Sequence, residues 1–182
     1  MRAVRAQTAR TLNLAVRTNS PHKQLWAIFM TDNISPQGVF TLVVRDKEGQ
    51  IKEERVIKNL VTNAGHAGYA SRANGSGAEA VFTYLAVGTG TNAAAVGDTT
   101  LQTEITDSGL ARANATASRV TGSVTNDTAR LTYTWSVSGT KAVTEIGILN
   151  ASSSGTLATR SVFSAVNVVS GDSLTATYDV RF

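Results

Sequence analysis

The sequence has no cysteine, which excludes disulfides, thiolate nucleophiles and zinc sites built on sulfur. It has no apolar run near the roughly 20 residues of a membrane-spanning helix, and its N-terminus lacks the apolar core of a secretory signal. We therefore expect a protein made in the cytoplasm, with no membrane partner. Aromatic and charged residues are sparse, at 6% and 16%, while Thr, Ser, Val and Gly are abundant. That composition favours antiparallel β-sheets over a helical enzyme.

Acidic residues are missing from the first 31 positions, which hold five basic residues. The other 151 residues carry 12 basic and 13 acidic side chains, so the net charge of +4 belongs to one end. We predict a basic arm over residues 1–24 and one folded domain over residues 25–182. The arm side chains expected to bind a partner are Arg2, Arg5, Arg10, Arg17, Leu12, Leu14 and Val16.

The arm has two readings, a segment bound to a partner or a solvated tail. As a bound segment it would form a short helix or add a strand to a neighbouring subunit. Its arginines suit an acidic protein surface. Nucleic acid is not favoured, because nucleic-acid binders carry denser Lys and Arg with interleaved aromatics.

Apolar and polar residues alternate with a period of two through most of the domain, which predicts β-strands. Residues 39–45 and 51–57 read as a hairpin, with Gly49 supplying the positive φ of its turn. Residues 131–138 form the clearest strand. Residues 174–182 alternate to the last position, so we expect Phe182 to be buried with the apolar residues before it. About eight such strands predict an antiparallel β-sandwich with one or two short helices and an extended N-terminal arm.

Two helices are expected. The first begins at Thr62 or Asn63 and ends at Gly75 or Gly77. Its glycines, Gly65 and Gly68, weaken it in isolation and would permit close packing on a sheet. The second is a single turn over residues 99–102.

Candidate catalytic groups are weak. The turn Gly88-Thr89-Gly90-Thr91 has no following lysine and no third glycine, so it fits neither a phosphate loop nor a dinucleotide site. The two histidines, His22 and His66, lack metal-ligand spacing. We predict no enzyme, no cofactor and no metal site.

Two glutamates stand in apolar or threonine-rich surroundings, Glu104 and Glu145. Buried charges are usually paired, so we expect Glu145 to pair across strands with Arg112 or Arg160. Their expected role is structural.

Three segments resemble a domain of tailed-bacteriophage virion structural proteins. They are Ala86 to Thr91 (AVGTGT), Val143 to Asn150 (VTEIGILN), and Gly171 to Phe182, which follows a GDxLxxxxxxxF pattern. The resemblance implies a non-enzymatic virion protein with other capsid or tail proteins as partners. The short chain and its own arm favour a small multi-copy or homo-oligomeric subunit, such as a capsid decoration protein or a tail, neck or baseplate component.

An alternative is a receptor- or glycan-binding tip of a tail fibre. Its contact surface would be the loops 88–109 and 151–155. Carbohydrate sites usually expose aromatic rings, and these loops contain none. An enzyme with an unrecognised site is the third hypothesis.

Overall fold

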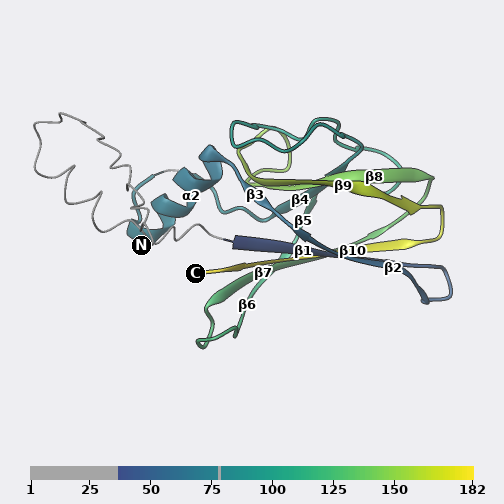
Figure 1. Ribbon diagram of the computed structural model, residues 1–182, viewed down its shortest axis with the longest axis horizontal. Coiled ribbons are helices and arrows are strands. Elements are labelled where there is room, and N and C mark those ends of the chain that lie inside the picture. The colour runs from purple at the N-terminus through teal and green to yellow at the C-terminus, as the bar shows by residue number, and fades with distance from the viewer. Residues whose placement is uncertain (1–36, 78) are drawn as a thin grey trace, which may run out of the picture. The chain divides into compact units, whose positions relative to one another are not determined.

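The chain folds mainly as β-structure. The computed structural model describes residues 37–77 and 79–182, in which ten strands form two five-stranded antiparallel sheets beside one helix (Figure 1). The first sheet has the order β2-β1-β10-β7-β6 and the second the order β3-β9-β8-β4-β5. The predicted β-sandwich is therefore confirmed.

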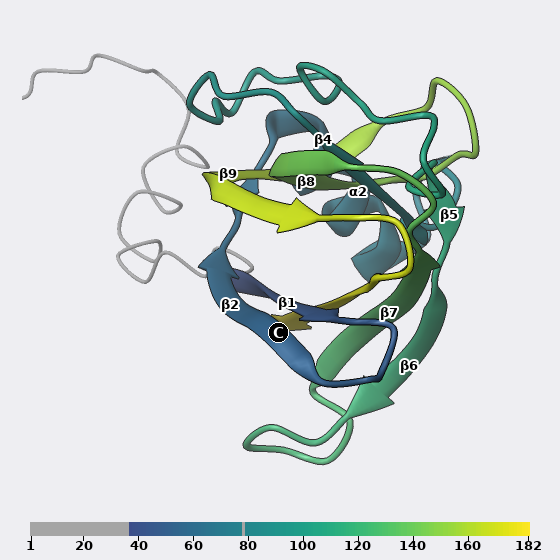
Figure 2. The same ribbon diagram turned by 90° about the vertical axis from the view of Figure 1, so that its right-hand side faces the viewer.

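The first sheet contains β1 (Gln37–Arg45), β2 (Ile51–Lys58), β6 (Thr116–Val120), β7 (Thr128–Ser136) and β10 (Ser173–Arg181). The second contains β3 (Leu60–Val61), β4 (Tyr84–Gly88), β5 (Ala113–Asn114), β8 (Lys141–Leu149) and β9 (Leu157–Val168). In Figure 2, β2 and β6 lie at opposite edges of the first sheet.

The β1–β2 hairpin forms as its sequence predicts. Gly49 has φ +82°, which a residue with a side chain rarely adopts. The Asp46 carboxylate accepts hydrogen bonds from the backbone N–H groups of Glu48 and Gln50, and so fixes the turn. This short turn brings β2 back beside β1 in antiparallel register.

Asn59 stands where the chain passes from the first sheet to the second. Its side-chain oxygen accepts from the Gly38 N–H at 2.8 Å. Its amide nitrogen donates to the Thr159 hydroxyl at 2.6 Å and to the Tyr178 hydroxyl at 3.1 Å. One polar side chain thus ties strands of both sheets together at the crossing point.

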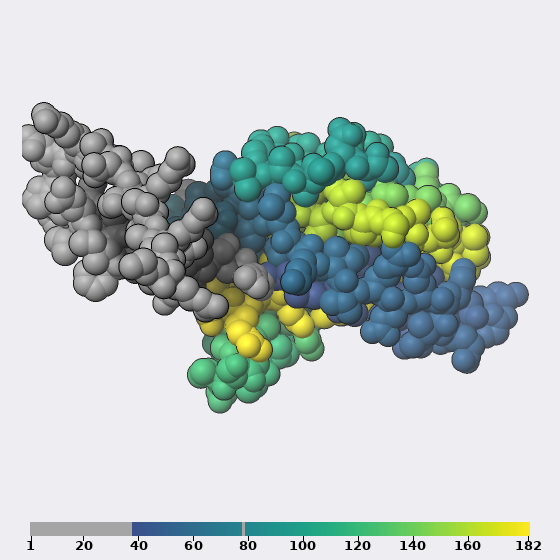
Figure 3. Space-filling model, viewed as in Figure 1, coloured from purple at the N-terminus to yellow at the C-terminus, as the bar shows by residue number. Residues whose placement is uncertain are grey.

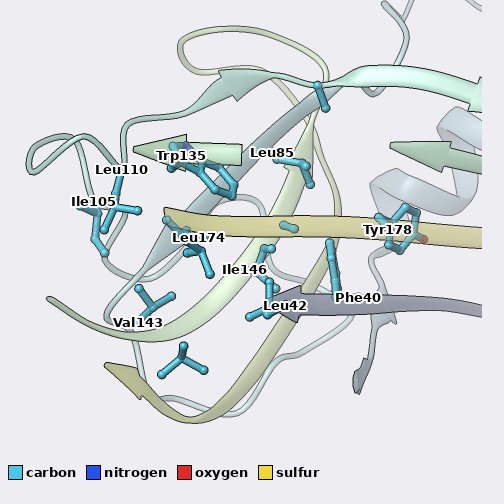
Figure 4. Packing of buried hydrophobic residues seen from close by; sticks show 14 of the residues in the cluster. Phe40, Leu42, Leu85, Ile105, Leu110, Trp135, Val143, Ile146, Leu174 and Tyr178 are labelled. Atoms are coloured by element: carbon cyan, nitrogen blue, oxygen red, sulfur yellow. The ribbon is translucent and has the colours of Figure 1, made fainter. Parts of the chain in front are cut away.

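The core lies between the two sheets (Figure 4). In β7, Leu131 and Trp135 are buried and Tyr133 packs on the core, and Val137, just after the strand, is buried too, as the alternation predicts. Trp135 satisfies its indole N–H by donating to the Ala111 carbonyl at 2.8 Å. The largest buried side chains of the core are Trp135, Tyr178, Phe40, Leu42, Leu85, Ile146, Ile148 and Leu174.

The helix α2 (Asn63–Asn74) begins and ends where predicted. The Thr62 hydroxyl accepts from the Gly65 N–H, and Gly75 ends the helix at φ +70°. A β-carbon on Gly65 would collide with the backbone of Ala158, and one on Gly68 would collide with the Phe82 ring. The glycines weaken the helix but allow it to lie directly on β9, which confirms the expected close packing.

Two expectations about local structure are wrong. Phe182 is 66% exposed and lies beyond the end of β10, with its ring 5.8 Å from that of Tyr69. The other apolar residues of the series, from Leu174 to Val180, are buried as predicted. Residues 99–102 form no helix, because the backbone N–H groups of Gln102 and Thr103 turn instead toward a buried carboxylate.

Candidate functional site

A long loop covers the outer face of the second sheet. Residues 89–112 run from the end of β4 to the start of β5 and lie over β8 and β9 (teal in Figure 3). Leu101 of this loop packs with Ala86, Leu149 and Leu157 in a small second cluster of buried side chains. The molecule therefore has a third layer on this face, built from irregular chain rather than from a helix or a sheet.

The Glu145 carboxylate lies under this loop, and its side chain is fully buried. Its Oε1 accepts from the N–H groups of Gly90 at 3.0 Å and Thr103 at 2.7 Å. Its Oε2 accepts from the Gln102 N–H at 3.0 Å. A strand residue thus gathers three backbone donors, one from the start of the loop and two from near its middle. Hydrogen bonds to an ionised group are the strong ones, and these replace the water that burial removes.

Glycine is required at two positions around this carboxylate. The chain lies so close to Glu145 at Gly88 and Gly90 that a β-carbon at either residue would collide with the carboxylate. Gly88 also pairs directly with Glu145 across β4 and β8. The Gly88–Thr91 turn therefore forms one side of a carboxylate-binding cradle.

Arg160, from β9, neutralises the buried charge. Its Nε donates to Glu145 Oε2 at 2.8 Å, its Nη1 to Asp98 Oδ2 at 2.8 Å and its Nη2 to the Asn92 carbonyl at 3.1 Å. The guanidinium is only 3% exposed. Although burial disfavours its charged form, bonds to Asp98 and Glu145 raise the pKa of Arg160.

The hydrogen bond from Arg160 also changes the pKa of Asp98. Burial opposes its ionised form, but the Ala95 N–H and the Arg160 guanidinium lower the pKa of Asp98 below its ordinary value. Asp98 therefore remains a carboxylate and fixes the middle of the loop over β9.

A second ion pair fixes the far end of the loop. Arg112 binds both carboxylate oxygens of Glu104, with its Nε at 2.9 Å and its Nη2 at 2.6 Å. Its Nη1 donates to the carbonyls of Ala151 and Ser154 in the turn between β8 and β9. The covering loop is thus joined to the adjacent turn as well as to the sheet.

Sequence reasoning predicted part of this arrangement. It expected Glu145 to pair with Arg112 or Arg160, and Arg160 is the partner. It treated the Gly88–Thr91 turn as a strand end and missed its second role, the enclosure of Glu145. No local signal marks this role, because it depends on the pairing of β4 with β8.

An apolar groove of about 300 Å³ opens beside β6 and α2. Tyr69, Phe82, Ala117, Leu131, Tyr178 and Val180 are among its lining residues. The ring of Tyr69 meets that of Phe82 edge-on at 5.8 Å. Most of its lining side chains are apolar.

The other sequence candidates are placed as follows. His66 is exposed on α2. Within residues 37–77 and 79–182, no group of three or more His, Asp or Glu side chains is arranged to hold a metal ion. In the same residues no helix is long and apolar enough to cross a membrane. The predicted arm residues and His22 lie outside the described residues.

Comparison with known proteins gives no further assignment. The chain matches no family model, no curated protein and no solved structure.

Proposed function

We propose that this chain is a non-enzymatic structural protein of a tailed-bacteriophage virion. It is a small multi-copy subunit, of the capsid decoration type or of the tail, neck or baseplate. The arm, residues 1–24, attaches it to neighbouring virion proteins, and the two-sheet domain is the rigid body that the arm holds in place.

One observation carries this proposal. Two of the three segments that resemble phage virion proteins form a single unit, because the Gly88–Thr91 turn encloses the carboxylate of Glu145 in β8. The third segment supplies β10, the central strand of the first sheet. The resembling residues Gly88, Gly90 and Glu145 therefore depend on one another in space, and this supports the proposal.

The charged groups of this unit support a structural role. Both oxygens of Glu145 accept hydrogen bonds from backbone N–H groups. The three nitrogens of the Arg160 side chain donate to Glu145, to Asp98 and to the Asn92 carbonyl. Such saturated networks rigidify a protein. Their effect here is to fix a 24-residue loop against a sheet, as suits a subunit that must keep its shape within a particle.

Particle incorporation tests the proposal. The full chain and a variant lacking residues 1–24 are expressed during assembly, and purified particles are quantified by mass spectrometry. We expect the full chain in many copies per particle and the truncated chain at less than a tenth of that occupancy, although it remains folded by circular dichroism. Truncated protein at normal occupancy would show that the arm is not the attachment.

A charge series sharpens this test. Replacing Arg2, Arg5, Arg10 and Arg17 by Gln removes the arm's charge, whereas replacing them by Lys retains it. We expect the Gln variant to dissociate from particles at lower salt than the Lys control, because attraction between exposed charges is screened. Absence of the full chain from purified particles, with saturable binding on a glycan array, would replace this proposal by the receptor-binding alternative.

A further inference from the structure

The first sheet has one edge that is open to strand addition. The second sheet ends on strands of two residues each, β3 and β5, and β2 carries charge at five of its eight positions. β6 is the last strand of the first sheet, has five residues and carries one charge, Arg119. Proteins usually protect such edges with charges, short length or a covering segment. Among the described residues, β6 has no further strand beside it, and Arg119 is its single charge.

The apolar groove lies along the same edge. Ala117 of β6 and Leu131 of β7 stand opposite each other in register and line the groove together. Side chains at every second position of a strand added to β6 would therefore point into the groove. In strand addition, backbone hydrogen bonds supply affinity, and pockets for alternate side chains supply specificity. This edge and its groove provide both.

The chain itself contains a segment of matching pattern. Leu12, Leu14 and Val16 alternate with Asn13 and Ala15, so an extended strand would place all three larger apolar side chains on one face. The segment has five residues, as does β6. Its length and its alternation both fit the open edge.

One acidic group, Glu79, lies beside the groove, whose lining itself carries Arg72 and Arg130. Arg10 and Arg17 flank the segment. Beside the groove, the Glu79 carbonyl accepts from Arg72, a groove residue, and Glu79 Oε2 has no hydrogen-bond partner among the described residues. An arginine of the incoming segment would supply that donor.

We propose that residues 12–16 of a neighbouring copy add a strand to β6 and insert Leu12, Leu14 and Val16 into the groove. An arginine flanking the inserted strand pairs with Glu79. This inference rests on the proposed function, because it names another copy of the chain as the protein that receives the arm. Each subunit then gives an arm to one neighbour and accepts an arm from another, which joins copies in a ring or a chain.

Disulfide trapping between two full-length variants tests the contact, and the chain has no native cysteine to interfere. The Leu14→Cys variant carries a size tag and is mixed, in separate experiments, with untagged Ala117→Cys and with untagged Arg119→Cys. The two positions test two registers in which the added strand could pair with β6. Each molecule has a single thiol, so a tagged–untagged disulfide forms only between copies. We expect this species to form at least tenfold faster than with Thr134→Cys, an exposed position on β7, an inner strand of the first sheet.

Equal rates for all three untagged partners would overturn the proposal. The double variant Leu14→Cys/Ala117→Cys supplies a second discriminating result. If it closes only within monomers at micromolar protein, the arm occupies its own molecule and the neighbour assignment is wrong.

Self-association gives an independent measurement. By sedimentation, we expect Leu14→Asp to weaken association of the full chain on the order of tenfold, because a charge enters an apolar groove. Asn13→Asp is the matched control with the same charge on the opposite face of the segment, and should change association less than threefold. Equal effects of the two substitutions would contradict the insertion of Leu14.

The two proposals fail separately. If particles incorporate the chain only when residues 1–24 are present and no cross-link forms, the virion role stands and the β6 site is wrong. If the cross-link forms but purified particles lack the protein, the self-association stands and the virion role is wrong.

Discussion

The two sheets differ in what covers their outer faces. The second sheet carries the loop 89–112, and its β8 is buried at all five positions from Glu145 to Leu149. On the first sheet, β10 alternates buried with partly exposed residues along most of its length. A sheet buried on both faces reads as a continuous apolar run, whereas a half-covered sheet reads as an alternation. The near-continuous burial of β8 therefore indicates that its outer face is covered, whereas the alternation of β10 indicates a face that is not.

The exposed fractions of two ion pairs, one on each sheet, measure this difference in covering. Arg160 and Glu145 are 3% and 0% exposed under the loop, whereas Arg130 and Asp179 are 38% and 34% exposed on the first sheet. Arg130 donates to both oxygens of Asp179, at 2.7 and 2.6 Å, so each pair joins a guanidinium to a carboxylate. Burial decides the cost of losing a partner, because a carboxylate in water is solvated and one in the core is not.

The largest expected effect is therefore at Glu145. Replacing it with Ala leaves the buried Arg160 guanidinium with Asp98 alone in place of two carboxylate partners and releases three backbone donors. We expect the free energy of unfolding to fall by about 3–5 kcal/mol, measured by urea denaturation. Replacing Glu145 and Arg160 together by Gln and Met should cost less than Glu145→Ala, because no buried charge remains. A loss below 1 kcal/mol for Glu145→Ala would show that the loop does not depend on this network.

The glycines of the cradle come next. In Gly90→Ala the added β-carbon would lie 2.5 Å from both Glu145 Oε1 and Gln102 Cβ. We expect a loss of about 1–3 kcal/mol, as for other overpacked sites, by thermal and urea unfolding. Gly97 is the matched control in the same loop, since a β-carbon there meets nothing within 4 Å. Gly97→Ala should be neutral or slightly stabilising. Equal losses at the two positions would contradict the steric cause.

Acid should weaken the turn between β6 and β7. Hydrogen bonds from the N–H groups of Val124, Gly122 and Ser123 and from the Thr128 hydroxyl lower the pKa of Asp127, although burial opposes this. A carboxylate with a lowered folded-state pKa stabilises the fold above its unfolded pKa, near 3.8, and loses that contribution as the pH falls through the folded value.

The urea midpoint should thus decline below about pH 4, and Asp127→Asn should reduce the size of this decline. The same substitution at Asp46, where no backbone-turn network of this size exists, serves as the comparison. An unchanged pH profile in Asp127→Asn would show that Asp127 does not contribute to acid sensitivity.

Local signals made the fold largely predictable. Gly49, Thr62 and Gly75 act on neighbouring backbone, so the hairpin and the helix could be placed within a few residues. Prediction failed where distant groups decide the conformation. Residues 99–102 resemble a capped helical turn, but Glu145 lies more than 40 positions away and binds their N–H groups. Phe182 continues the alternation of β10, yet the strand ends at Arg181 and no core remains for its ring to enter.

The site was predictable only as a pairing of charges. An acid in an apolar strand implies a buried partner, which made Arg112 and Arg160 the candidates for Glu145. That Gly88 and Gly90 enclose the same carboxylate could not be inferred, because it depends on the register of β4 against β8. The β6 edge depends likewise on strand order, which local patterns do not specify.

The smallest expected effect is at the exposed pair. Replacing Arg130 or Asp179 with Ala should lower the free energy of unfolding by about 1 kcal/mol or less, because each remaining charge is hydrated. A double-mutant cycle measures the coupling of this pair, which we expect to be below 1 kcal/mol and to shrink at high salt. The pair at Glu145 and Arg160 should show a larger coupling that salt scarcely changes. If the two cycles gave equal couplings, burial under the loop would not be what separates the two faces.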